Sequence, residues 1–120
     1  MEKKYVRLAI VGGRDFQNYA YMQECLSELQ KEYTIIGVIS GGAKGADTLG
    51  EKWADQNKIT KRIFPADWEK YGKSAGMRRN KDIVDNADII AAFWDEKSRG
   101  TANTIERARL SGKILKIYKY

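Results

Sequence analysis

Three short segments of the chain combine glycine with charged or hydroxyl-bearing residues, which are the residue types that bind phosphate groups. They are residues 12–15 (Gly-Gly-Arg-Asp), residues 41–47 (Gly-Gly-Ala-Lys-Gly-Ala-Asp) and residues 98–101 (Ser-Arg-Gly-Thr). Glycine allows a backbone to approach an anion closely, and the first N–H groups of a helix have no partner within the helix. We therefore expect a phosphate cradle where these segments meet.

The first two segments depart from the known phosphate-binding fingerprints. Lys44 is followed by Gly45, where a P-loop has serine or threonine. Gly12 and Gly13 lack the third glycine of a dinucleotide-binding turn. Kinase-like and hydride-transfer chemistry therefore have little support from the sequence.

Three further side chains extend the predicted site. Arg79 lies near the start of a predicted helix, and its guanidinium is suited to a phosphate or a carboxylate. Trp68 lies in a predicted loop, where an aromatic side chain more often packs against the body of the protein, and stacking on a base is the alternative that makes it a candidate ligand contact. Asp47 is predicted to cap its helix, with a ribose hydroxyl as the alternative contact.

The composition limits the chemistry that the protein can perform. The 120 residues include no histidine and one cysteine, Cys25, which excludes a disulfide within the chain, a His/Cys zinc site and a Ser-His-Asp mechanism. We expect no metal and no cofactor, and acid–base work would fall to Asp, Glu, Lys or Tyr. The net charge of +6 favours an anionic partner. No apolar stretch approaches the roughly 20 residues of a membrane helix, so we expect a cytoplasmic protein without membrane contact.

Apolar periodicity predicts that strands and helices alternate along the chain. The predicted strands cover residues 5–11, 34–39, 60–64, 89–94 and 114–118, and the predicted helices cover 19–29, 46–54, 76–86 and 100–111, with a loop at 66–75. Because the strands lack polar alternation, we expect a parallel sheet covered by helices on both faces. The sequence thus predicts one Rossmann-like, doubly wound α/β domain over residues 1–120. Strand order 3-2-1-4-5 is favoured, and order 2-1-3-4-5 stays open.

The three glycine-containing segments follow the first, second and fourth predicted strands. Ligands of an open parallel sheet bind beyond the carboxyl ends of the strands, near the point where the strand order reverses. The predicted topology therefore brings the three segments to one edge of the sheet.

Taken in order, these motifs resemble the SLOG superfamily, which is named after the Smf/DprA and LOG proteins, and especially its small stand-alone YspA-related branch. The resemblance is carried by residues 11–16, 41–47, 64–68, 71–76, 79–80, 87–88 and 98–101. It implies a Rossmann-like fold that binds nucleotides or nucleotide-derived ligands. Pairing of related SLOG proteins through helices beside the site also implies a homo-oligomer.

The LOG members hydrolyse the ribosyl bond of cytokinin nucleotides, using an arginine followed by lysine and a Gly-Gly-x-Gly-Thr-x-x-Glu motif. In the resemblance Arg79 falls on that arginine, and Asn80 replaces the lysine. Gly100 and Thr101 fall on the Gly-Thr pair of the motif.

The chain departs from the LOG pattern at the glutamate of this motif. Thr104 stands at the position of the glutamate, and Glu106 lies roughly 200° around the helix from it. Cleaving an N-ribosyl bond needs a carboxylate beside the developing oxocarbenium ion or its attacking water, so binding is favoured over hydrolysis. If the protein is an enzyme, the catalytic candidates are Asp15, Asp47, Arg79 and Glu106.

The expected function is binding of a nucleoside monophosphate or an ADP-ribose-like ligand, as a sensor or a sequestering module. The alternatives are a LOG-type phosphoribohydrolase or N-glycosidase, and single-stranded DNA binding of the DprA type. The predicted ligand-binding residues are Gly12, Gly13, Arg14, Asp15, Gly41, Gly42, Ala43, Lys44, Gly45, Asp47, Trp68, Lys73, Arg79, Asn80, Ser98, Gly100, Thr101 and Thr104.

Overall fold

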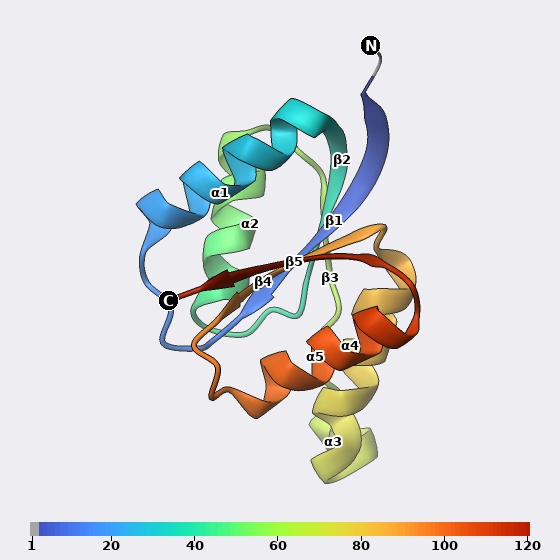
Figure 1. Ribbon diagram of the computed structural model, residues 1–120. Helices are drawn as coiled ribbons and strands as arrows, with labels where there is room; N and C mark the ends of the chain where they lie inside the picture. The colour runs from blue at the N-terminus through green and yellow to red at the C-terminus, as the bar shows by residue number, and fades with distance from the viewer. Residues whose placement is uncertain (1–2) are drawn as a thin grey trace.

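The computed structural model, which describes residues 3–120, contains one five-stranded sheet with strand order β3-β2-β1-β4-β5 (Figure 1). All four strand pairs are parallel. The strands are β1 (Lys4–Gly12), β2 (Tyr33–Ser40), β3 (Lys61–Ile63), β4 (Ile89–Trp94) and β5 (Ile114–Lys119). The α/β class and the order 3-2-1-4-5 are confirmed, and the order 2-1-3-4-5 is excluded.

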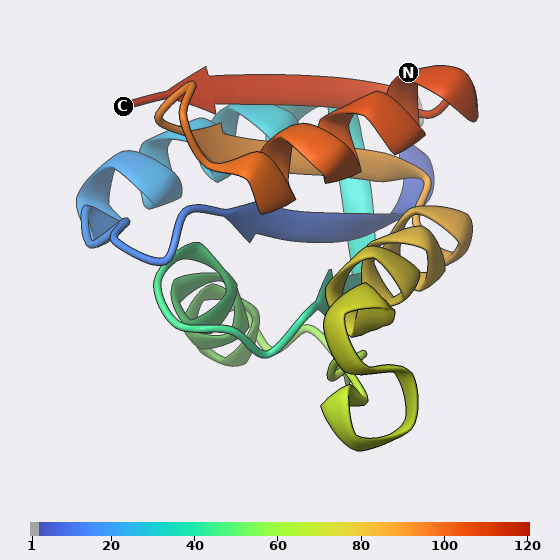
Figure 2. The same ribbon diagram turned by 90° about the horizontal axis from the view of Figure 1, so that it is seen from below.

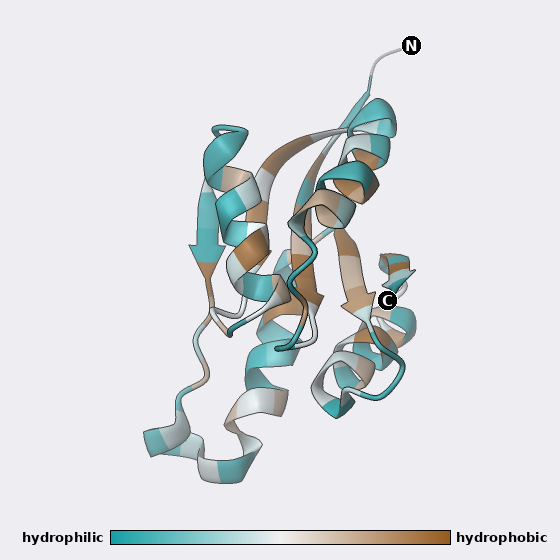
Figure 3. Cartoon of the chain, turned by 90° about the vertical axis from the view of Figure 1, so that its left-hand side faces the viewer, coloured by the Kyte–Doolittle hydropathy of each residue, from teal (hydrophilic) through white to brown (hydrophobic). Residues whose placement is uncertain are grey.

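Four helices cover the two faces of the sheet, and they are α1 (Tyr19–Glu32), α2 (Ala46–Gln56), α4 (Ala75–Asn86) and α5 (Arg99–Leu110). Helices α1 and α2 pack on one face, and α4 and α5 pack on the other (Figure 2). Along β1, Leu8 and Ile10 point into the first core, whereas Ala9 and Val11 point into the second. This burial on both sides explains why the strands lack polar alternation, and Figure 3 shows the hydrophobic colouring concentrated in the inner strands of the sheet.

The structure corrects one predicted element. Residues 66–75 were expected to form a loop, but they contain the short helix α3 (Trp68–Tyr71) and the 3₁₀ turn η1 (Gly72–Ser74). Asp67 caps α3, because its Oδ1 accepts a hydrogen bond from the Lys70 N–H at 3.1 Å. Helices of one turn are too short to leave an apolar period in a sequence. Together α3 and η1 form an arm that projects from the sheet beside α4 (Figure 2).

The topology creates a crevice beside β1. In the sheet, β2 and β3 lie on one side of β1, and β4 and β5 lie on the other side. The strand order therefore reverses at β1. In such sheets the crevice at this switch point is where ligands bind. Among residues 3–120, no helix has the length and apolar character needed to cross a membrane.

Candidate ligand-binding cleft

A cleft of about 740 Å³ lies at the carboxyl edge of the sheet, beyond the ends of β1 and β4. Its walls come from the loop after β1, the loop after β4, and the first turns of α4 and α5. It is lined by Val11, Gly12, Gly13, Arg14, Asp15, Ala43, Asp47, Trp68, Lys73, Gly76, Met77, Arg79, Asn80, Ile83, Asp95, Ser98, Arg99, Gly100, Thr101, Asn103 and Thr104.

The cleft brings together most of the residues that the sequence singles out, from four separate stretches of the chain. All of the residues predicted in the first and third glycine-containing segments line it, and so do Trp68, Lys73, Arg79, Asn80 and Thr104. The second segment behaves differently, because only Ala43 and Asp47 reach the lining. The predicted residues outside the lining are Gly41, Gly42, Lys44 and Gly45.

Three N–H groups between the end of β2 and the start of α2 are bonded within the protein. The Gly42 N–H donates to Ser40 Oγ at 3.1 Å, and the Ala43 N–H donates to Asp47 Oδ2 at 3.2 Å. At the first position of α2, the Ala46 N–H donates to the Gly13 carbonyl at 3.1 Å. An anion would have to displace these acceptors in order to bind at this loop.

Asp47 holds the loop instead of capping its helix, which corrects the expected cap. The N-cap of α2 is Gly45, whose φ of +80° favours glycine, and no side chain caps the helix. Asp47 lies one residue inside α2, so its carboxylate turns back toward Ala43. The sequence alone does not show whether α2 begins before or after Asp47. In the structure Gly45 is the N-cap, so Asp47 is the second residue of the helix and not its cap.

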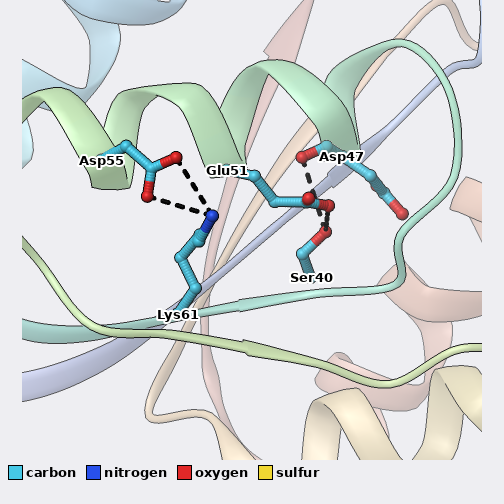
Figure 4. Close-up of polar contacts among 5 residues, drawn as sticks. All are labelled: Ser40, Asp47, Glu51, Asp55 and Lys61. Carbon is cyan, nitrogen blue, oxygen red and sulfur yellow. Dashed lines mark hydrogen bonds and ion pairs between the residues drawn. The ribbon is translucent and has the colours of Figure 1, made fainter.

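A second set of contacts fastens α2 to the sheet beneath it (Figure 4). Ser40 Oγ donates to Glu51 Oε2 at 2.7 Å, and it also lies 3.4 Å from the Asp47 carbonyl oxygen. Further along, Lys61 Nζ of β3 lies 3.0 Å from the Asp55 carboxylate. The loop and helix at the end of β2 are therefore held at several points.

Asp47 is a buried carboxyl group at the wall of the cleft, with 6% of its surface exposed. Burial raises the pKa of Asp47 from its ordinary value to about 6, and the Ala43 N–H and the nearby Arg79 guanidinium oppose this rise. A carboxyl group with a pKa near 6 can exchange a proton close to neutral pH.

The start of α5 is open to the cleft. Ser98 caps the helix, since its Oγ accepts from the Thr101 N–H at 3.4 Å. The N–H groups of Arg99 and Gly100 come earlier in the first turn, where the helix supplies no acceptor. No heavy atom lies within 4 Å of the place where a Cβ would stand on Gly100. The α5 start therefore presents free backbone donors beside empty space.

Asp95 shapes the loop that leads into α5. Its Oδ1 accepts hydrogen bonds from the Lys97 N–H at 2.9 Å and the Ser98 N–H at 2.8 Å. These donors stabilise the charged carboxylate and lower the pKa of Asp95. Although Asp95 lines the cleft, one of its oxygens is turned back on its own loop.

Arg79 and Asn80 connect the two loops across the floor of the cleft. Arg79 Nη1 donates to the Gly41 carbonyl at 2.7 Å, and its Nε donates to Asn80 Oδ1 at 3.2 Å. Asn80 Nδ2 in turn donates to the Gly100 carbonyl at 3.3 Å and to Asn103 Oδ1 at 3.1 Å. Side chains of α4 thus link the loop after β2 to the start of α5.

The two ends of the cleft differ in character. At the α3 and α4 end, Trp68 and Met77 are 54% and 51% exposed, which is unusual for large apolar side chains. The rest of the lining mixes apolar residues, such as Val11 and Ile83, with polar ones, and it is nearly balanced in charge. Its charged side chains are the cations Arg14, Lys73, Arg79 and Arg99 and the carboxylates Asp15, Asp47 and Asp95.

Thr104 and Glu106 are separated by the turn of α5. Thr104 lines the cleft and is 2% exposed, and its Oγ1 donates to the Gly100 carbonyl at 3.2 Å. Glu106 lies outside the lining, where its carboxylate is exposed and stands 3.7 Å from Arg109 Nη1. Among residues 3–120, no three His, Cys, Asp or Glu side chains gather in a way that could hold a metal ion.

Several residues that line the cleft are not among the predicted ligand contacts. Val11 and Ile83 have the pattern of core residues, and nothing in the sequence shows that they also border a cavity. Asn103 lies three residues after Gly100, so the helical period of α5 could have placed it on the same face. The other additional lining residues are Gly76, Met77, Asp95 and Arg99.

The sheet order, the switch point beside β1 and the cleft at that point define a Rossmann-like α/β protein. Residues 6–71, more than half of the chain, match the family model described as YspA, cpYpsA-related SLOG family. The chain belongs to this family, which confirms the resemblance seen in its motifs.

A phage protein supports the same assignment. The chain is 33% identical over 113 residues to the gene 61 protein of Mycobacterium phage D29, and the match covers 88% of this chain and 90% of that protein. No solved structure matches the chain.

Proposed function

We propose that the protein binds a phosphorylated nucleotide or a nucleotide-derived ligand in this cleft and acts as a sensor or a sequestering module. The observation that carries the proposal is one continuous cleft with the open start of α5 in one wall and the exposed Trp68 in another. Membership of the SLOG family supports a nucleotide-related ligand.

The start of α5 supports phosphate as one part of the ligand. Free N–H groups and the helix dipole favour an anion there by roughly 0.3–1 kcal/mol, and by up to about 2 kcal/mol in a partly buried site. The Arg99 side chain belongs to the same turn, and Lys73 and Arg79 line the cleft as further cations. Charge-assisted hydrogen bonds from such groups are the stronger kind of polar contact.

The exposed indole of Trp68 supports a base as another part. Stacking of a base on an aromatic ring contributes roughly 1–3 kcal/mol per base. Gly76 lies beside this ring, since a Cβ on Gly76 would stand 3.4 Å from the Trp68 ring edge. A phosphorylated ligand without a base would leave this surface uncovered.

A thermal-shift series tests the proposal. AMP and ADP-ribose should raise the melting temperature at millimolar concentration, and adenosine should raise it much less because it lacks phosphate. Native mass spectrometry of the purified protein should show whether a nucleotide accompanies it. If AMP, ADP-ribose and the other nucleoside monophosphates all leave the melting curve unmoved, the proposal is wrong.

A second candidate function is hydrolysis of an N-ribosyl bond, and Asp47 is the observation that favours it. Asp47 is a carboxyl group at the cleft with a pKa near 6, which suits a general acid or base. Thr104 nevertheless stands where the LOG enzymes have their glutamate, so we expect no release of base or ribose 5-phosphate from AMP over hours. Turnover of about 1 s⁻¹ or more would establish an enzyme instead. Loss of that turnover in Asp47→Asn would then assign the group.

Two further proposals concern partners and setting. We propose a cytoplasmic homo-oligomer, because Tyr71 and Met77 expose apolar surface near the arm. Light scattering at tens of micromolar should give a mass of at least two chains, and a single-chain mass would contradict this.

DNA binding of the DprA type has less support, because the cleft is nearly balanced in charge. A steep loss of affinity for single strands with rising salt would revive it.

A further inference from the structure

The carboxylate of Asp15 is held at the cleft by a residue from the far end of the chain. Tyr120 follows β5, and its hydroxyl donates to Asp15 Oδ1 at 2.6 Å. The Tyr120 ring packs edge-on against Phe16 with 4.8 Å between ring centroids. Its backbone N–H donates to the Trp94 carbonyl at 3.3 Å. The side chain of Tyr120 is therefore fixed before it reaches Asp15, and it fixes the carboxylate in turn.

Gly13 leaves the space that this pair occupies. A Cβ on Gly13 would collide with the Tyr120 hydroxyl and would come within 2.7 Å of Asp15 Oδ1. Gly13 is therefore required by close approach of side chains. The pair lies against the backbone of the loop after β1, and Asp15 is the member that lines the cleft.

Asp15 differs from the other two carboxylates of the cleft. Asp47 and Asp95 each accept from backbone N–H groups of their own loops. Asp15 accepts only from Tyr120, and within residues 3–120 no hydrogen bond or ion pair reaches its Oδ2. Burial and the Asp15 charge raise the pKa of Tyr120, so the phenol stays protonated and keeps its role as donor. A carboxylate has no hydrogen-bond donor, so the Asp15 carboxylate can only accept a hydrogen bond from a ligand.

We infer that Asp15, positioned by Tyr120, accepts a hydrogen bond from a sugar hydroxyl of the ligand, so that the cleft selects ribose over deoxyribose compounds. The inference rests on the proposed function, and it adds the sugar to the phosphate and the base. A carboxylate repels phosphate, so Asp15 cannot serve the anion itself. The donors of a phosphorylated nucleoside are its sugar hydroxyls and the amino groups of its base. The exposed aromatic surface suited to the base belongs to α3, a different element from the loop that carries Asp15.

Asp15→Asn separates hydroxyl recognition from a general charge effect, because the two predict opposite signs. Removing a negative charge near an anion site should leave the affinity for inorganic phosphate unchanged or raise it. If the carboxylate accepts from a sugar hydroxyl, the same change should weaken a ribose ligand at least fivefold. Isothermal titration calorimetry with AMP, ADP-ribose and inorganic phosphate measures both effects.

Compounds that lack either one sugar hydroxyl or the terminal ribose supply the matched ligands. In the unaltered protein, AMP should bind at least fivefold more tightly than 2′-deoxy-AMP, or ADP-ribose should bind at least fivefold more tightly than ADP, which lacks the terminal ribose. Asp15→Asn should reduce that preference to less than twofold. Tyr120→Phe keeps the ring against Phe16 and removes only the hydroxyl, so it should reduce the preference partly while leaving inorganic phosphate unchanged. In the double variant Asp15→Asn with Tyr120→Phe, the effects should not add, because Tyr120 acts through Asp15.

The outcomes separate this inference from the proposed function. If no phosphorylated nucleoside binds the unaltered protein, the proposed function fails. If AMP and ADP-ribose bind but neither shows a preference over its matched compound, or if Asp15→Asn strengthens them as it does phosphate, then sugar recognition by Asp15 is wrong while nucleotide binding stands. A Tyr120→Phe variant that loses phosphate and sugar binding together would assign Tyr120 to folding alone.

Discussion

The starts of α2 and α5 look alike in sequence and differ in the folded protein. Each helix follows a parallel strand through a glycine-containing loop, and both begin at the carboxyl edge of the sheet. In the loop before α2, the Gly42 and Ala43 N–H groups donate to the side chains of Ser40 and Asp47. The start of α5 faces the cleft, and Gly100 there has no neighbour where a side chain would project.

From this difference we propose that a glycine-rich helix start binds a ligand only where its donors still lack acceptors within the protein. At α2, the Asp47 carboxylate accepts the hydrogen bond of the Ala43 N–H, as an oxygen of an anionic ligand would otherwise do. At α5 the side-chain acceptor comes from Ser98 and reaches Thr101, beyond the first two N–H groups. We therefore assign phosphate binding to α5 and a structural role to the loop before α2.

The largest effect should come from placing a carboxylate at the start of α5. Gly100→Asp has open space for its side chain, and an acidic residue in the first turn favours the helix itself. Because the new charge occupies and repels the anion site, AMP affinity should fall at least 100-fold, about 2.7 kcal/mol, while the melting temperature holds. Calorimetric titration and thermal unfolding measure the two quantities.

Lys44→Ala is the matched control, since it changes the net charge by the same amount at the start of α2. Lys44 lies outside the cleft lining, and salt screens exposed charges over roughly 10 Å, so AMP affinity should change by less than about twofold. A larger loss in Lys44→Ala than in Gly100→Asp would reverse the assignment of the two helix starts.

The second effect concerns the internal carboxylate at α2. The folded protein holds Asp47 at a pKa of about 6, above the ordinary value of 3.8, so it binds this proton more tightly than the unfolded chain does. The contribution of Asp47 to the free energy of unfolding therefore falls as the pH rises from about 4 to about 6, and then levels off. Asp47→Asn keeps an acceptor for the Ala43 N–H and removes the charge. Its free energy of unfolding should exceed that of the unaltered protein by up to about 3 kcal/mol at pH 7.5, since one pKa unit corresponds to about 1.4 kcal/mol.

Urea unfolding at pH 4 and pH 7.5 checks this expectation. The two proteins should converge at pH 4, where the folded-state carboxyl is protonated. An Asp47→Ala variant is the comparison, because it also leaves the Ala43 N–H without its acceptor and should be less stable than Asp47→Asn at both pH values. If Asp47→Asn loses stability at pH 7.5, the charged carboxylate is needed by the fold and burial does not dominate.

The third effect tests the connection between the two helix starts. Arg79 donates to the Gly41 carbonyl on one side and to Asn80, which reaches the Gly100 carbonyl, on the other. Arg79→Ala should weaken AMP at least tenfold, about 1.4 kcal/mol, because it removes a cation and loosens this link. Arg79→Lys keeps the charge but not the forked geometry, so it should recover only part of the loss. If both variants bind AMP as the unaltered protein does, Arg79 contributes to neither site nor link.

The fold was predictable because its strands are buried on both sides and end at glycine or polar residues. Residues 89–94 are apolar throughout, as an interior strand such as β4 must be, and the alternation of periods gives the β-α order. The arm at α3 was not predictable in this way. Its two short turns depend on the Asp67 cap and on contacts with α4, neither of which leaves a period.

The site was predictable as an edge of the sheet but not in its internal bonding. The glycine pattern marks both helix starts equally, and only the folded chain shows that Asp47 satisfies one of them. The contact between Asp15 and Tyr120 joins residues at opposite ends of the sequence, so no local pattern could indicate it. Val11 has the sequence pattern of a core residue, so the sequence does not indicate that it also lines a cavity.

The smallest effect concerns the cap that keeps the α5 start in shape. Ser98 Oγ accepts from the Thr101 N–H and lies 3.1 Å from Thr101 Oγ1, so Ser98→Ala removes an N-cap and should lower the free energy of unfolding by about 1 kcal/mol. Ser98→Thr retains the hydroxyl and should stay within about 0.5 kcal/mol of the unaltered protein. Helix α2 offers the contrast, because Gly45 caps it without any side chain to remove. AMP affinity should fall by less than about fivefold in Ser98→Ala, since the N–H groups of Arg99 and Gly100 stay in place. Thermal unfolding and titration of the same two variants measure these effects. If Ser98→Ala abolished binding, the Ser98 hydroxyl itself would be the ligand contact, and the assignment of Ser98 as a helix cap alone would be wrong.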